Sequence, residues 1–513
     1  MEMTCLGCKK EYTGYEERIG QYIANGMILA IENGVPKESL YEMPTTYFIP
    51  DIELYCDNCI AKIKTVEDSV DNLLLKVSSK NVDVNKKLDK HSDFFWNQST
   101  DSEDDKEKFV FLFSYIEECF SLSSEIASEL KYLFNRFEDH TVVNFDNFSY
   151  MFYFRNVTLK SISLIEKLTI FYSVAFNVEF RKNKIQNKYE FLLKQLRKIP
   201  SFQDKKFYEM MNKFRKKGDS FNLEDTRKSL DHDLSYNNGV EMIGVLDKID
   251  IIYNLVCMCY DLFDEMITLV LNVYKNIQIP SDYSNLKYQD ASIISVQYPN
   301  PEDTYAFSQT FGERVHQFNK AFLKDGILGE NSNEADNSKR VFDILNRLNE
   351  ISRTHVIVNN LITAAIDNNW KFKDVLIEEL CEKNYDSLIN DIIYRIYAVN
   401  DKLARLLVNK YNLFTESKYI YFDDFQDVIN DKNNEQIIIN NKDVFTNLDI
   451  FLCSKEYKFL TNNRNRIFHI RNDQNNFIES EEESFNIFRL NNIQEYYSYM
   501  NKIMIPILND IKP

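Results

Sequence analysis

Two arginine–histidine pairs with one spacing are the residues of this sequence best suited to chemistry. Arg464 precedes His469 in TNNRNRIFHIRND, and Arg227 precedes His232 in DTRKSLDHD, so each histidine follows its arginine by five positions. The chain has only six histidines, and one such spacing alone would be a weak signal. Two pairs are a stronger signal because they stand at similar places in two halves of the chain.

An arginine and a histidine supply much of what is needed to cut RNA without a metal ion. Arginine keeps its positive charge and offers a forked donor for phosphate oxygens. Histidine has an ordinary pKa of about 6.5 and can therefore move protons near neutral pH. When the 2′-hydroxyl of RNA attacks its own phosphate, the enzyme needs a base, an acid and a stabiliser of extra charge. Two facing pairs would cover these tasks, whereas one pair would not.

The residues around the two pairs are expected to hold the substrate. On a helix, Asn465 and His469 are four positions apart and share a face. Lys228 occupies the place in the first pair that Asn465 occupies in the second, and it could add a phosphate contact. Arg466 and Arg471 surround the second histidine and are predicted to bind RNA.

Four cysteines near the N-terminus predict a metal site. They form two Cys-x-x-Cys pairs, Cys5/Cys8 and Cys56/Cys59. Each pair can present two thiolates from a tight loop, and four thiolates complete a tetrahedral zinc shell. Because cysteine fills all four positions, no position is left for a catalytic water. We therefore predict a structural Zn²⁺ that folds a small ribbon-like module, and we expect no catalytic metal.

Composition favours a mostly helical protein. The 513 residues include only 11 glycines and 9 prolines, and apolar residues recur at helical spacing. The most apolar long run, 251–274, carries three acids, so we expect a buried helix there and no membrane contact. The five remaining cysteines are scattered and no secretory signal opens the sequence, which together predict a cytoplasmic protein.

The formal charge of −18 argues against a general polyanion binder. RNA would therefore need a local basic groove. Two stretches could form one: KKFYEMMNKFRKK at 205–217 and the arginines around the second motif. A solvated helix face explains the first stretch equally well.

Two blocks of similar texture make up most of the chain. Long apolar helices are expected over 150–176 and 389–411, with Arg155 in the first and Arg395 in the second. The arginine of the nearest Rx₄H pair follows 72 residues after Arg155 and 69 residues after Arg395. This pattern predicts an internal duplication.

The expected order is a four-cysteine zinc module (1–64), a helical linker (65–105), a first helical domain (106–278), an inter-domain linker with a short helix (279–337) and a second helical domain (338–513).

A helical domain that closes with an RNxxxH motif and one further helix resembles the HEPN ribonuclease superfamily. The stretch RNRIFH (464–469) has the full signature, and RKSLDH (227–232) has its arginine and histidine with lysine in place of asparagine. The resemblance implies two tandem helical bundles that form a pseudo-dimer with one composite site. It also implies a metal-independent endoribonuclease that leaves 2′,3′-cyclic phosphate ends, similar to stand-alone HEPN proteins of anti-phage defence and abortive infection.

Three functions are compatible with the sequence. The first is an endoribonuclease of anti-phage defence or stress response, with RNA as substrate and Arg227, His232, Arg464, Asn465 and His469 as catalytic residues. The second is a non-catalytic HEPN scaffold that binds RNA, a nucleotide or a protein. The third is the toxin of a toxin–antitoxin pair, with an antitoxin or another regulatory protein as partner. The sequence leaves open whether the chain forms a homodimer.

Overall fold

The structure, a computed structural model, describes part of the chain. The described residues are 2–5, 10–13, 55–96, 102–138, 150–179, 188–218, 242–279, 385–416 and 420–454, with single positions within 20–31, 223–230, 340–354 and 457–461. They are mostly helical, which confirms the predicted fold class at that level. None of their helices combines the length and apolar character that crossing a membrane requires. The chain divides into two compact units, of which the described residues up to 279 form the first and those from 340 to 461 the second.

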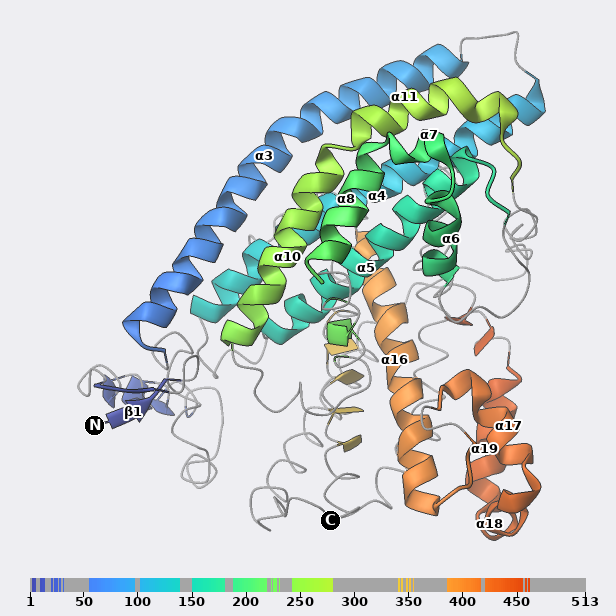
Figure 1. Cartoon of the computed structure of the whole chain (residues 1–513). Helices are drawn as coiled ribbons and strands as arrows, with labels where there is room; N and C mark the ends of the chain where they lie inside the picture. The colour runs from blue at the N-terminus through green and yellow to red at the C-terminus, as the bar shows by residue number, and fades with distance from the viewer. Residues whose placement is uncertain are drawn as a thin grey trace, which may run out of the picture. The chain divides into compact units, whose positions relative to one another are not determined.

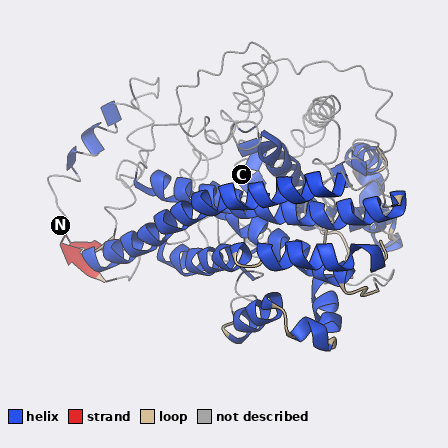
Figure 2. Ribbon diagram, turned by 90° about the horizontal axis from the view of Figure 1, so that it is seen from above, coloured by secondary structure: helices blue, strands red, loops and turns tan. Residues whose placement is uncertain are grey.

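The first unit begins with a hairpin and a long helix. Strands β1 (Glu2–Thr4) and β2 (Glu11–Thr13) pair antiparallel. Helix α3 (Asp57–Trp96) buries Ile63, Val70 and Val77 at intervals of seven, the spacing of a helix seam. It runs alongside α10 (Met242–Tyr260) and α11 (Phe263–Val273) (Figures 1 and 2). The predicted zinc module and helical linker therefore share one continuous helix.

The centre of the first unit is an antiparallel pair, α4 (Glu103–Glu138) and α5 (Tyr150–Ala175). Every described side chain of α5 from Phe152 onward is buried. Four of its hydroxyl side chains donate a hydrogen bond to the backbone carbonyl four residues earlier: Thr158, Ser161, Thr169 and Ser173. Two buried lysines pair with α4: Lys167 with Glu118, and Lys160 with two glutamates.

The apolar run 251–274, expected as one helix, is divided into α10 and α11. The break falls at Asp261 and Leu262. The acids of the run lie at or directly after it, where they meet polar partners instead of the core. Asp261 pairs with Lys80 of α3, and Glu265 accepts hydrogen bonds from the hydroxyl of Tyr172 and the backbone N–H of Lys206.

Three short helices follow α5 and cover part of it: α6 (Lys188–Leu196), α7 (Pro200–Gln203) and α8 (Lys206–Lys216). On α8 the buried side chains occupy one face at the helical spacing i, i+3, i+4, i+7; they are Phe207, Met210, Met211 and Phe214. The ring of Phe207 stacks on Tyr172 of α5 with centroids 4.5 Å apart. The positions described next in the chain, 223, 225–227 and 230, are also helical.

The second unit is built around α16 (Tyr385–Tyr411), which forms buried ion pairs with helical residues of 340–354. The short elements η6 (Phe422–Asp424), α17 (Phe425–Asn430), η7 (Lys432–Asn434), α18 (Glu435–Asn440) and α19 (Lys442–Leu452) follow it. Asn434, fully buried, holds this segment by hydrogen bonds to both backbone groups of Phe414 and to the carbonyl of Val428.

The two units repeat one order of helices at a nearly constant offset. Helices α5 and α16 begin 235 positions apart, α7 and α18 also 235, and α8 and α19 236. An asparagine with positive φ follows each long helix, Asn177 at 51° after α5 and Asn412 at 52° after α16. In each case the next N–H bonds back to a carbonyl five residues earlier, Val178 to Ser173 and Leu413 to Val408, which is the same capping motif.

The buried ion pairs repeat in the same register. In both units, two cations seven positions apart on the long helix pair with acids seven positions apart on the preceding helix. They are Lys160 and Lys167 with Glu125 and Glu118, and Arg395 and Lys402 with Glu350 and Asp343. Arg395 therefore corresponds to Lys160, whereas the sequence pattern aligned it with Arg155. The two alignments of the repeats differ by five residues. The ion pair requires only a cation on the long helix, so lysine in the first unit replaces the arginine of the second.

Candidate metal centre and catalytic motifs

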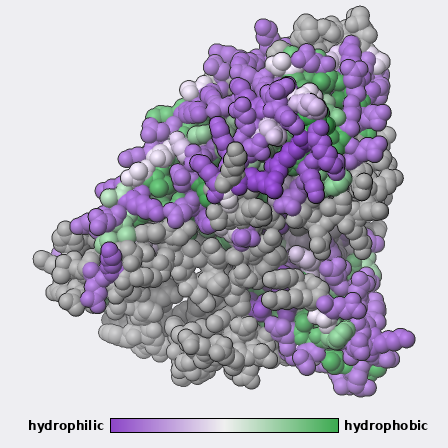
Figure 3. Space-filling view, in the orientation of Figure 1, coloured by the Kyte–Doolittle hydropathy of each residue, from purple (hydrophilic) through white to green (hydrophobic). Residues whose placement is uncertain are grey.

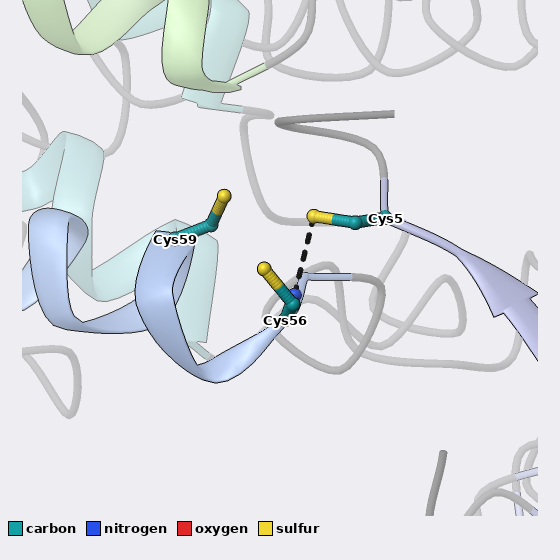
Figure 4. Close-up of side chains that lie close together, drawn as sticks. All are labelled: Cys5, Cys56 and Cys59. Carbon is teal, nitrogen blue, oxygen red and sulfur yellow. Dashed lines mark hydrogen bonds between the residues drawn. The ribbon is translucent and has the colours of Figure 1, made fainter. Parts of the chain in front are cut away.

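Three cysteines from two elements come together at the start of the first unit. Cys5 directly follows β1, Cys56 directly precedes α3, and Cys59 lies in the first turn of α3. Their sulfur atoms lie within 4.8 Å of one another and point into a common space (Figure 4). Thiolates around a tetrahedral zinc at about 2.3 Å would lie about 3.8 Å apart, so the spacing suits a metal ion.

Backbone hydrogen bonds hold this cluster. The backbone N–H of Cys56 donates to the Sγ of Cys5 at 3.2 Å (Figure 4). The N–H of Cys5 donates to the carbonyl of Lys10 at 2.9 Å and closes the hairpin. The N–H groups at the start of α3 also favour negative charge, which suits two thiolates placed there. Cys8, the predicted fourth ligand, lies outside the described residues.

Arg227 is the one predicted catalytic residue within the described part of the chain. It lies in helical residues 225–227 with its side chain half-buried, between the buried residues Thr226 and Leu230. The other predicted catalytic and RNA-binding residues lie outside the described residues and stay predictions; they are Lys228, His232, Arg464, Asn465, Arg466, His469 and Arg471.

Tyr457, which precedes the second motif, takes part in a contact that the sequence does not signal. The hydroxyls of Tyr397 on α16 and Tyr457 both donate to the carboxylate of Asp423. Burial, and next the charge of Asp423, raise the pKa of Tyr457 well above its ordinary value, so its hydroxyl stays a donor. Tyr457 stands seven positions before Arg464, so the network anchors the last described stretch before the motif, within 457–461.

No protein-family model, curated protein or solved structure matches the chain. The resemblance to HEPN ribonucleases therefore rests on the motif residues and on their place in the two repeats.

Proposed function

We propose that this chain is a HEPN-type, metal-independent endoribonuclease with a composite site made of two Rx₄H motifs. The supporting observation is the repeated order of helices. Arg227 and Arg464 are 237 positions apart, against 235 to 237 for the helices that precede them. The two motifs thus follow the repeated helices at nearly the same distance along the sequence, as two equivalent half-sites require.

The proposed reaction divides its tasks among the two half-sites. One of His232 and His469 removes the proton from the 2′-hydroxyl, and the 2′-oxygen attacks the adjacent phosphorus. The bond from phosphorus to the 5′-oxygen breaks, and the other histidine protonates that leaving oxygen. Arg227 and Arg464 neutralise the extra charge on the phosphate. The products are a 2′,3′-cyclic phosphate and a 5′-hydroxyl.

An assay of RNA cleavage in EDTA tests this function. The wild-type protein should cut RNA with the chelator present and leave cyclic phosphate ends, and the Arg464→Ala/His469→Ala protein should not. Cleavage that stops in EDTA and returns with a divalent metal would contradict the proposed chemistry. Cytoplasmic RNA, of the host or of a phage, is the substrate that this proposal implies.

We further propose that the cysteine cluster binds one structural Zn²⁺, with Cys8 as the fourth ligand. The Cys56→Ser protein should lose most of its zinc, because serine removes one of four thiolates and the hydrogen bond to Cys5 is made by the backbone alone. Elemental analysis of the purified protein measures this. Cys453→Ser, which changes an exposed cysteine of the second unit, is the control and should keep about one zinc per chain. Equal zinc in both variants, or none in the wild type, would refute the assignment.

A further inference from the structure

The segment α6–α8 has a charge opposite to that of the chain. Residues 188–218 contain ten lysines and arginines against three acids, in a protein with a net charge of −18. The corresponding segment of the second unit, α17–α19 at 425–452, contains two lysines against five acids. Both segments have the same place in the repeated fold, so the fold itself does not require the positive charge.

Most of the cations described in this segment are exposed. Because α8 turns its apolar face inward, its other residues face solvent, and hydrophilic side chains gather over the area where α8 lies (Figure 3). Six exposed cations form no ion pair with any described residue: Lys194, Lys198, Lys206, Lys213, Arg215 and Lys217. By contrast, Lys62, Lys80 and Lys87 of α3 each pair with an aspartate of α10, α11 or the turn between them.

The charges of two arginines of the segment, Arg197 and Arg215, act on each other. Arg197 follows α6 with its Nε buried and without a hydrogen-bond partner among the described residues. Burial, and next the nearby charge of Arg215, lower the pKa of Arg197. Two guanidinium groups repel each other, and a phosphate bound between them would relieve that repulsion through charge-assisted hydrogen bonds.

We propose that α6–α8 is a docking surface for the phosphate backbone of RNA and that its counterpart α17–α19 is not. The proposal rests on the proposed endoribonuclease function, to which it adds the route by which an acidic protein holds its substrate. RNA fits better than an anionic membrane, because membrane-surface helices bury an apolar face and no large apolar side chain described in 188–218 is exposed. Half-exposed Tyr208 of α8 adds an aromatic ring to this surface, on which an unpaired base can stack.

The test measures binding of a single-stranded RNA with 2′-O-methyl sugars, which lacks the attacking hydroxyl and cannot be cut. Lys213→Gln/Arg215→Gln removes two exposed cations of α8, and Lys432→Gln/Lys442→Gln removes two exposed cations of the counterpart segment. Both doubles change the net charge equally. The first should weaken binding about tenfold or more and make the slope of log affinity against log salt shallower by about 1.4. The second should change affinity less than about twofold.

Each other outcome has a definite meaning. Equal losses in both doubles would show an effect of net charge and overturn the proposal, as would unchanged binding in the α8 double. Weaker binding of that double to anionic phospholipid vesicles, with unchanged RNA binding, would assign the surface to membranes instead. If the wild type binds the methylated RNA but cuts no RNA, the nuclease proposal fails and the docking surface stands. If the wild type cuts RNA and the α8 double variant binds RNA normally, the nuclease proposal stands and the docking-surface proposal fails.

Discussion

Replacing His469 by alanine is expected to lower the rate of RNA cleavage by about 10²–10⁴-fold, and replacing His232 should have a similar effect. Each histidine carries one of the two proton transfers, so neither half-site can replace the other. The measurement is single-turnover cleavage of a labelled RNA across a range of pH. The wild type should show a bell-shaped profile, because one imidazole must be neutral and the other protonated, and each variant should lose one limb.

His91→Ala is the matched control, because this histidine has no arginine five positions before it. It should cleave like the wild type. Full activity in His232→Ala would show that the first repeat only supports the second, a result that Lys228 in place of asparagine would help to explain. A loss in all three variants alike would point to folding and not to catalysis.

Lys167→Met is expected to destabilise the protein by about 3–5 kcal/mol, because it leaves Glu118 buried without its lysine. The Lys167 Nζ lies 2.8 Å from the Glu118 Oε2, and the two side chains are only 2% and 7% exposed. Adding Glu118→Leu should recover most of the loss, since the pair is then replaced by apolar groups. Chemical denaturation followed by circular dichroism measures the change in the free energy of unfolding.

Two controls make this prediction specific. Lys62→Met breaks a pair with Asp247 whose side chains are 45% and 69% exposed, and should cost less than about 1 kcal/mol. Lys402→Met changes the equivalent position of the second unit, where Asp343 keeps Arg347 at 3.5 Å, so the loss should be smaller than for Lys167→Met. Similar losses for Lys167→Met and Lys62→Met would show that burial does not set the cost.

The sequence is sufficient to predict the structure where one strong periodicity or one chemical requirement determines it. The helix expected over 150–176 is α5, and the one expected over 389–411 is most of α16. Cys-x-x-Cys spacing predicted that Cys5 would meet Cys56 and Cys59, because four thiolates at such spacing have few other uses.

The sequence is insufficient to predict the structure where the decisive interaction joins residues that are far apart in the chain. The break between α10 and α11 depends on polar partners outside the apolar run, and periodicity within the run does not reveal them. The register of the repeat depends on which cation pairs with which acid. By residue type Arg155 matches Arg395 better than Lys160 does, but Lys160 forms the equivalent ion pair. The role of Asp423 cannot be predicted from its neighbours in the sequence, because it depends on two tyrosines from different segments that bind its carboxylate.

The repeat has a consequence for how the two halves can evolve. In a symmetric homodimer every substitution appears twice, so both subunits acquire each new charge together. In a duplicated chain a substitution appears once, and one copy can change while the other keeps its role. The segments α6–α8 and α17–α19 carry opposite net charges, and the two identical subunits of a symmetric dimer could not differ in this way. Joining two copies in one chain thus permits a division of labour between them.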